Sequence, residues 1–225
     1  MIHKTKGIVL NYIKFKESSI ICKIFTESFG LQSYIVNGVR NLKSSKNISL
    51  FQPLTLVDLV VYNKYSSDIQ RIKEIKVDII YLTNHTSIKK VSVCLFLSEL
   101  LTKILSNEPD QNEKFNFLYN SFIVFDQLKK DFNNFHIQFL LRLTKIFGFE
   151  ISDVNQILNS NSKSKEINAF VLNCISMNFN SKINSNYYQR NEVLNALILY
   201  FSQSLGIPIK IKSLKVLKEV FNPTI

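Results

Sequence analysis

The spacing of hydrophobic residues changes near Asp78, and this change constrains the fold more than any other feature of the sequence. Before Asp78, short segments rich in β-branched and aromatic residues alternate with turns, which is typical of β-strands. After it, apolar residues recur at intervals of three and four, which is typical of amphipathic helices. The sequence therefore predicts an α+β protein with two domains, a β-structured one over residues 1–80 and an α-helical one over residues 81–225.

Five strands are expected in the first domain, with short turns between most of them and Pro53 before the fourth. Five strands in about 75 residues predict a small closed barrel of the OB-fold type, because an open sheet of this size would leave its edges unpaired. The expected strands are Gly7–Phe15, Ser19–Thr26, Leu31–Val36, Leu54–Tyr62 and Ile69–Val77.

The helices of the second domain differ in how much apolar surface they present. Phe135–Phe147 is apolar nearly all round and should be the central buried helix, ending at Gly148. Ser213 is the expected N-cap of the last helix. The other expected helices are Val91–Leu105, which should end near Asn107, Phe115–Phe125, Ile167–Met177, Leu194–Leu205 and Leu214–Phe221.

The charge of the protein indicates an anionic partner. There are 28 Lys and Arg residues against 17 Asp and Glu residues, which gives a net charge of +11. Such a surface attracts polyanions, nucleic acid above all, although a solubilising coat of lysines is an alternative interpretation. No apolar stretch approaches the length of a membrane span, and the N-terminal segment lacks the apolar core of a secretory signal. We therefore expect a cytoplasmic protein.

Basic residues and tyrosines recur at the ends of the expected strands. Small five-stranded barrels bind single-stranded nucleic acid by stacking bases on exposed aromatic rings while cations follow the phosphates. Tyr62 and Tyr65 could supply such rings, although core-facing tyrosines in a solvated loop are equally consistent with the pattern. The candidate nucleic-acid-binding residues are Lys14, Lys16, Arg40, Lys43, Lys46, Lys64 and Arg71.

Arg142 and Lys145 are the candidate partner-binding residues, because they lie three apart on an otherwise apolar helix. Burying two unpaired cations is costly, so their side chains must reach solvent, pair internally or line a groove. Internal pairing of Arg142 would involve Glu99 or Asp126. A groove with a basic rim, beside the apolar faces of 91–105 and 115–125, would suit an acidic and aromatic peptide or the free C-terminus of another protein.

No catalytic motif, metal site or cofactor site is expected. The sequence lacks the glycine-rich, nucleophile and metal-binding patterns that such sites use, and it contains only 5 glycines. A zinc site needs about four ligands at close spacing, which isolated cysteines and histidines cannot supply. We therefore expect a protein that is not an enzyme, with Cys22 and Cys94 as core residues. The isolated residues are Cys22, Cys94, Cys174, His3, His85 and His136.

A series of short motifs resembles the RecO family over nearly the whole sequence. The first are Gly7-Ile8-Val9-Leu10, Glu17-Ser18-Ser19, Phe29-Gly30-Leu31, Gly38-Val39-Arg40 and Phe51-Gln52-Pro53-Leu54. Those in the helical domain are Arg142-Leu143, Phe147-Gly148-Phe149, Leu205-Gly206-Ile207-Pro208 and Lys212-Ser213-Leu214. Each motif is weak alone, and their order and spacing carry the resemblance.

The resemblance implies a recombination mediator with an N-terminal OB-fold and a C-terminal helical domain. It also implies binding of single- and double-stranded DNA, strand annealing, a complex with RecR, and docking on the acidic tail of single-strand-binding protein to help load RecA. A bacterial, nucleoid-associated location would follow. Many members carry a four-cysteine zinc motif after the position of Gly148. In this sequence, residues 150–187 contain a single cysteine, Cys174. The alternatives are another OB-fold nucleic-acid binder, such as an RNA- or ribosome-associated factor, and a scaffold that docks acidic partners.

Overall fold

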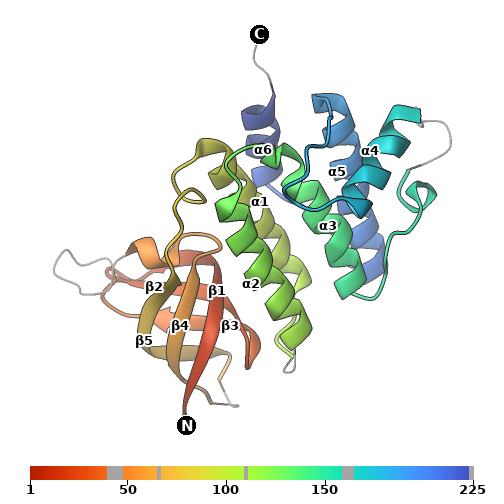
Figure 1. Ribbon diagram of the computed structural model, residues 1–225. Coiled ribbons are helices and arrows are strands. Elements are labelled where there is room, and N and C mark those ends of the chain that lie inside the picture. The colour runs from red at the N-terminus through yellow and green to blue at the C-terminus, as the bar shows by residue number, and fades with distance from the viewer. Residues whose placement is uncertain (40–47, 65–66, 109–110, 159–164, 223–225) are drawn as a thin grey trace.

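The computed structural model of the protein describes residues 1–39, 48–64, 67–108, 111–158 and 165–222. Five strands form a closed barrel in the order β1-β2-β3-β5-β4, with β3 and β5 parallel and the other neighbours antiparallel (Figure 1). The helices follow the barrel in the sequence, so the prediction of an α+β protein with an OB-fold-like barrel is confirmed. The strands are β1 Ile2–Phe15, β2 Ser19–Thr26, β3 Gly30–Val36, β4 Leu56–Tyr62 and β5 Ile69–Ile79.

Four strand boundaries differ from the expected ones: β3 begins one residue early, at Gly30, β5 ends two residues late, at Ile79, and the other two are the starts of β1 and β4. β1 begins at Ile2 rather than Gly7, because its first half pairs with β4 in the segment that closes the barrel. β4 begins at Leu56 rather than Leu54, because Leu54 has a φ of 65°, a left-handed conformation that interrupts an extended strand. The starts of β1 and β4 depend on the tertiary structure, so the local pattern of residues could not predict them.

Six α-helices lie in the described residues, and all five expected helical segments beside the central one have a counterpart among them. The central helix α3 is buried on most of its surface, and Gly148 follows it with a φ of 83°. None of the helices in the described ranges has the length and hydrophobicity needed to cross a membrane. The helices are α1 Ile88–Ile104, α2 Asn112–Gln127, α3 Phe135–Ile146, α4 Lys165–Ser176, α5 Tyr187–Leu205 and α6 Ser213–Phe221.

The expected cap of α6 is wrong by one residue. Ser213 is the first residue of the helix and Lys212 is the N-cap. The capping acceptor comes from α1, where the Glu99 carboxylate accepts hydrogen bonds from the Lys212 and Ser213 backbone N–H groups, both at 2.9 Å. The Ser213 hydroxyl also donates to Glu99, at 2.6 Å. A carboxylate at a helix N-terminus satisfies donors that the helix itself leaves unpaired.

The barrel and the helices share one hydrophobic core. Ile8, Leu10 and Phe25 of the barrel belong to the same buried cluster as the inner residues of α1, α2 and α3. Phe25 packs against Phe115 of α2, with the ring centroids 6.0 Å apart. A second cluster fills the barrel interior. The barrel therefore has a fixed orientation on α1 and α2.

Gly30 lies at a close approach between the barrel and the end of α1. The Leu31 N–H donates to the Ser106 carbonyl at 2.9 Å. Gly30 has a φ of 64°, and a Cβ atom there would lie 2.4 Å from the Glu108 carbonyl oxygen. Only glycine satisfies both the backbone conformation and the available space.

Lys90 ties the start of α1 to the end of α2. The residue is 1% exposed. The ammonium donates to the Thr83 hydroxyl at 2.7 Å and to the carbonyls of Phe125 and Asp126 at 2.6 and 3.0 Å. These carbonyls belong to the last turn of α2, where helices lack intrahelical partners.

Candidate nucleic-acid interface

The outer surface of β1, β2, β3 and β5 carries two rows of neighbouring residues, which we call the barrel face. In one row, Ile13, Ile21, Ile35 and Arg71 are successive cross-strand partners. In the next, Asn11 pairs with Lys23, and Lys23 with Ser33. The alternate residues of these strands point into the barrel, so the exposed side chains of the barrel face combine apolar and basic groups.

Some apolar side chains on and beside the barrel face are exposed to solvent, whereas Ile21 and Ile35 are partly buried. Ile13 is 62% exposed and Ile69, the cross-strand neighbour of Ser33, is 42% exposed. Tyr62, which pairs with Arg71 across β4 and β5, is 39% exposed. Large exposed apolar side chains beside cations provide contact surface for bases and charge for phosphates.

The barrel face contains Arg71, one of the predicted binding residues, and Lys23, which the prediction missed. Both side chains are exposed, and no ion pair within the described residues joins either of them to a carboxylate. The alternation of Ile20, Cys22 and Ile24 with outward residues was the signal that could have identified Lys23.

Lys14 and Lys16 lie at the end of β1, as predicted, and both are exposed. The Ser19 hydroxyl donates to the Asn37 side-chain oxygen at 3.1 Å, which places the β1–β2 turn beside the start of the segment that follows β3. Arg40, Lys43 and Lys46 belong to that segment and lie outside the described residues.

Lys64 is not brought together with Lys14 and Lys16. It follows Asn63, whose carbonyl accepts a hydrogen bond from the N-terminal amine of Met1 at 3.4 Å, so it lies at the opposite end of β1. Gln70, which is 5% exposed, fixes the turn that contains Lys64. Its side chain accepts from the Lys64 N–H at 2.9 Å and donates to the Lys64 and Ser67 carbonyls at 2.9 and 2.6 Å.

The opposite surface of the barrel, over β1, β4 and β5, has a groove of about 760 Å³ in which three of the four lining lysines form ion pairs with carboxylates. Lys76 pairs with Asp58 at 3.2 Å, Lys73 with Glu74 at 3.7 Å and Lys6 with Asp78 at 2.7 Å. A phosphate bound in this groove would have to compete with these carboxylates. The groove is lined by Lys4, Thr5, Lys6, Glu27, Asp58, Leu59, Val60, Lys73, Glu74, Ile75 and Lys76.

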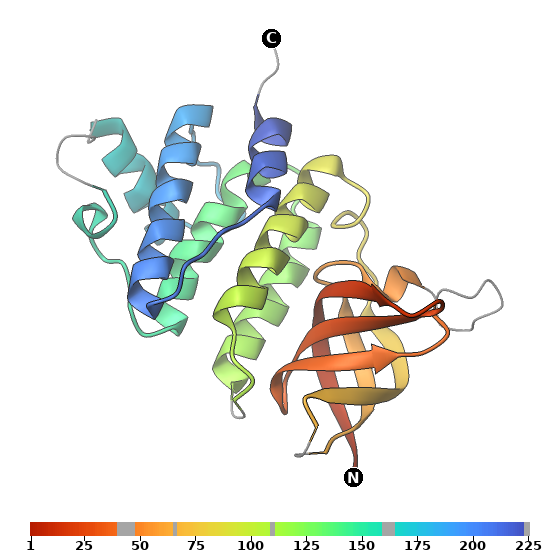
Figure 2. The ribbon, with the colours of Figure 1, turned by 180° about the vertical axis from the view of Figure 1, so that it is seen from behind.

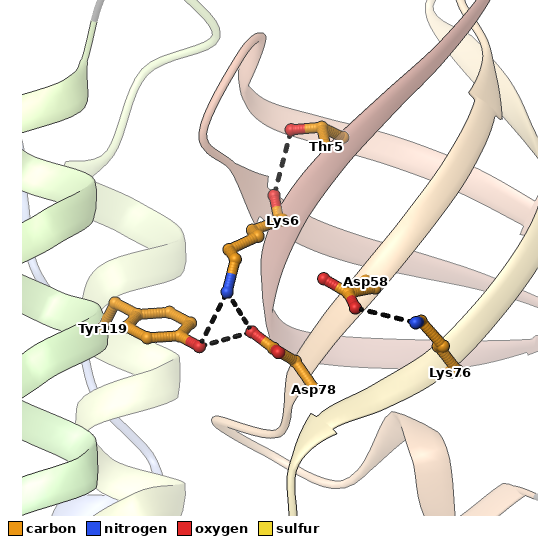
Figure 3. Close-up of polar contacts among 6 residues, drawn as sticks. All are labelled: Thr5, Lys6, Asp58, Lys76, Asp78 and Tyr119. Atoms are coloured by element: carbon orange, nitrogen blue, oxygen red, sulfur yellow. Dashed lines mark hydrogen bonds and ion pairs between the residues drawn. The ribbon is translucent and has the colours of Figure 1, made fainter.

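Lys6, Asp78 and Tyr119 connect this groove to α2 (Figure 3). Lys6 donates to Asp78 at 2.7 Å and to the Tyr119 hydroxyl at 3.2 Å, and the Tyr119 hydroxyl donates to Asp78. The hydrogen bond to Asp78 raises the pKa of Lys6 above its ordinary value. Burial alone would raise the pKa of Asp78, but the bonds from Lys6 and Tyr119 hold it below its ordinary value. The cluster stays charged at neutral pH and joins the barrel to the helices.

Arg142 makes structural contacts that the sequence did not predict. Its guanidinium donates to the Met177 carbonyl at 2.5 Å and lies 4.0 Å from the ring centroid of Phe179. The alternative that Arg142 pairs with Glu99 or Asp126 is wrong. Glu99 caps α6, and Asp126 accepts hydrogen bonds from the backbone N–H groups of residues 82–84.

Lys145 lies one turn along α3 from Arg142 and pairs with Glu150 at 3.5 Å. Its side chain is 69% exposed, so the ion pair leaves it accessible. The apolar faces expected to flank the two cations are largely buried in the core, including Val93, Leu97, Phe115 and Phe122.

Cys22, Cys94 and Cys174 are buried, and burial raises the pKa of each thiol to about 12. Thiols in this state are unreactive at neutral pH. Within the described ranges, no three His, Cys, Asp or Glu side chains gather in a way that could hold a metal ion.

Comparison with known proteins decides the family. The profile described as recombination protein O N terminal matches residues 1–80, and the one described as recombination protein O C terminal matches residues 85–170. The chain belongs to the RecO family. The matches cover the barrel and most of the helical region, and the family assignment supports a role in DNA repair.

Several bacterial relatives described as DNA repair protein RecO match nearly the whole sequence. The protein of Flavobacterium johnsoniae is 33% identical over 236 aligned positions, which cover 97% of this sequence and 99% of that protein. The protein of Flavobacterium psychrophilum is 34% identical, again covering 97% and 99%. The protein of Azobacteroides pseudotrichonymphae is 28% identical and covers 99% of this sequence and 100% of its own length. The resemblance of the sequence to the RecO family is thereby confirmed.

Proposed function

We propose that this protein is a DNA-binding and strand-annealing recombination mediator that acts without bond-making chemistry. The observation that carries the proposal is the barrel face, where Lys23 and Arg71 have no carboxylate partner among the described residues and share the surface with the exposed Ile13 and Ile69. Annealing requires that the phosphate repulsion between two strands be neutralised while the bases stay free to pair. An open cationic surface can do this, and no catalytic group is needed.

The partners of the proposed function are RecR, single-strand-binding protein and, indirectly, RecA. We propose that the acidic tail of single-strand-binding protein contacts the helical part at Lys145 and Arg142, and that the protein works at the bacterial nucleoid in the cytoplasm. Lys145 is the sharper probe, because its exposed side chain can be reversed in charge without loss of the Arg142 contacts to Met177 and Phe179. Lys145→Glu should abolish binding of a tail peptide and preserve binding of naked DNA.

A binding titration with a matched pair of variants tests the barrel face. Lys23→Ala with Arg71→Ala removes the two cations of the barrel face, whereas Lys73→Ala with Lys76→Ala removes the same charge from the groove on the opposite surface. Each lost phosphate contact should lower the slope of log K against log salt by roughly 0.7 for a single strand. The first variant should therefore lose about 1.4 units of slope and the second almost none.

Equal slopes for the two folded variants would overturn the assignment of this face. The same titration with matched single-stranded DNA, duplex DNA and RNA separates the alternative functions. A clear preference for RNA would support an RNA- or ribosome-associated factor, and no affinity for any of the three would support a scaffold for acidic proteins.

A further inference from the structure

A second group of cations lies at the C-terminal end of the described residues, and the proposed function does not yet use it. Residues 207–221 contain four lysines and a single carboxylate, Glu219. Lys210, Lys212 and Lys215 are exposed, and we call these three residues the C-terminal ridge. Lys215 approaches Glu219 at 3.9 Å, but its side chain is 85% exposed and stays open to a competing phosphate. Lys218 is partly buried and donates to the Asn195 side chain at 2.8 Å.

The segment that carries the C-terminal ridge lies on the same side of the molecule as the strands β2 and β3, which carry part of the barrel face (Figure 2). Seen from behind in Figure 2, the later part of β1, the strands β2 and β3, the helix α1 and the dark blue segment 206–221 all lie toward the viewer. α1 runs between the barrel and this segment, so a strand of nucleic acid that passes from one to the other on this side crosses α1.

Direct contacts join the barrel face to α1. The Asn11 amide, beside Lys23 in the barrel face, donates to the Thr102 hydroxyl of α1 at 3.3 Å. Lys103 is the next residue and is exposed. A cation is thus available at the point where the barrel meets the helix, and Lys103 has no ion pair to a carboxylate within the described part of the sequence.

Glu99 joins α1 to the C-terminal ridge. One turn before Lys103, its carboxylate accepts the backbone N–H groups of Lys212 and Ser213 at 2.9 Å each. Burial would raise the pKa of Glu99, but the hydrogen bonds of Ser213 and Lys212 and the charge of Lys103 lower it below its ordinary value. The ionised carboxylate is held by these hydrogen bonds, and it fixes the position of Lys212 at the edge of α1.

We propose that a nucleic-acid strand bound on the barrel face continues across α1 over Lys103 and onto the C-terminal ridge, with Glu99 as a positioning residue. The inference rests on the proposed function, since it extends the same binding surface. A single OB barrel accommodates roughly 4–16 nucleotides, so a longer strand has to leave the barrel. Its phosphates are attracted by the nearest exposed cations, and contacts of this kind are independent of sequence.

Length-dependent binding tests the continuation. The probes are single-stranded DNA of about 8 and about 30 nucleotides, chosen to lie within and beyond the reach of one barrel. Wild-type protein should show a steeper salt slope with the long strand. Lys210→Ala, Lys212→Ala and Lys215→Ala together should bind the short strand normally and lose about 2 units of slope with the long one.

The matched control removes three exposed lysines from other surfaces, Lys129, Lys130 and Lys165, and should keep the long-strand slope. Glu99→Ala should lower the long-strand slope with short-strand affinity unchanged, an effect that a purely stabilising role of Glu99 would not produce. An unchanged long-strand slope in the folded triple variant would overturn the continuation.

The failure of this inference is distinguishable from that of the proposed function. If the short strand does not bind wild-type protein, the barrel face itself is refuted. If the short strand binds and the ridge variant matches the control with the long strand, only the continuation is refuted. Loss of affinity for a polyglutamate peptide without any change in DNA binding would make the ridge a protein-docking surface and would likewise overturn it.

Discussion

His136 makes the stability of the fold depend on pH in a way that can be calculated from the structure. It lies in α3 with 2% exposure, against the rings of Phe96 and Phe221 at centroid distances of 6.3 and 5.7 Å. Its Nδ1 atom has no hydrogen-bond partner in the described residues. Burial, with a smaller contribution from the charge of Arg190, lowers the pKa of His136 to about 3.

The sign and size of the effect follow from linkage. Because the folded pKa lies below the value of about 6.5 in the unfolded state, the unfolded state binds more protons between these values. The contribution of His136 to stability is complete above about pH 6.5 and is lost as the pH falls below it. With 1.36 kcal/mol for each pH unit, the loss between pH 8 and pH 5 is about 2 kcal/mol.

Urea unfolding followed by circular dichroism at pH 8, 7, 6 and 5 measures this loss. His136→Leu replaces the imidazole by an apolar side chain of similar size that does not titrate. Between pH 8 and pH 5, the unfolding free energy of the wild-type protein should therefore fall by about 2 kcal/mol more than that of the variant. The comparison uses the pH dependence and is independent of the stability of the variant at pH 8. Identical pH dependence in the two proteins would refute the reasoning.

Three further predictions concern contacts between elements of the fold. Lys90→Met should lower the unfolding free energy by about 3 kcal/mol, because two buried carbonyls lose their donor, and Lys129→Met should have almost no effect in the same urea titration. Gly30→Ala should lower the melting temperature more than Gly38→Ala. Both glycines have a positive φ, but only at Gly30 would the new Cβ atom clash with a carbonyl oxygen. Equal melting temperatures of the two variants would contradict this. Arg142→Glu should lower stability by about 1–2 kcal/mol through loss of its bond to Met177, and an unchanged melting temperature would show that this contact is unimportant.

The order and type of the elements were predictable because they depend on local periodicity. The alternation in Ser19–Thr26 and the apolar surface of Phe135–Phe147 are each visible within a single segment, and both appear in the structure. The start of β1 was missed because it depends on pairing with β4, whose residues are far away in the sequence. The cap of α6 was missed for the same reason, since its acceptor is Glu99 of α1.

The candidate site was less predictable than the fold. Proximity to the ends of strands is what the sequence shows of these cations, and Lys64 and Arg71 share it, although only Arg71 lies in the barrel face. It could not distinguish paired from unpaired lysines, because the carboxylates that neutralise Lys6 and Lys76 come from other strands. Lys23 was the residue that the alternation within β2 could have supplied.

Strand annealing by the two matched barrel variants tests the central claim most directly. The rate of duplex formation from complementary fluorescent and quencher-labelled single strands is measured at fixed salt with wild-type protein, Lys23→Ala with Arg71→Ala, and Lys73→Ala with Lys76→Ala. Wild-type protein should accelerate annealing, the barrel-face variant should lose most of this acceleration, and the groove variant should retain it. Acceleration retained by the folded barrel-face variant and lost by the groove variant would contradict the account, because the paired surface would then be the one that meets DNA.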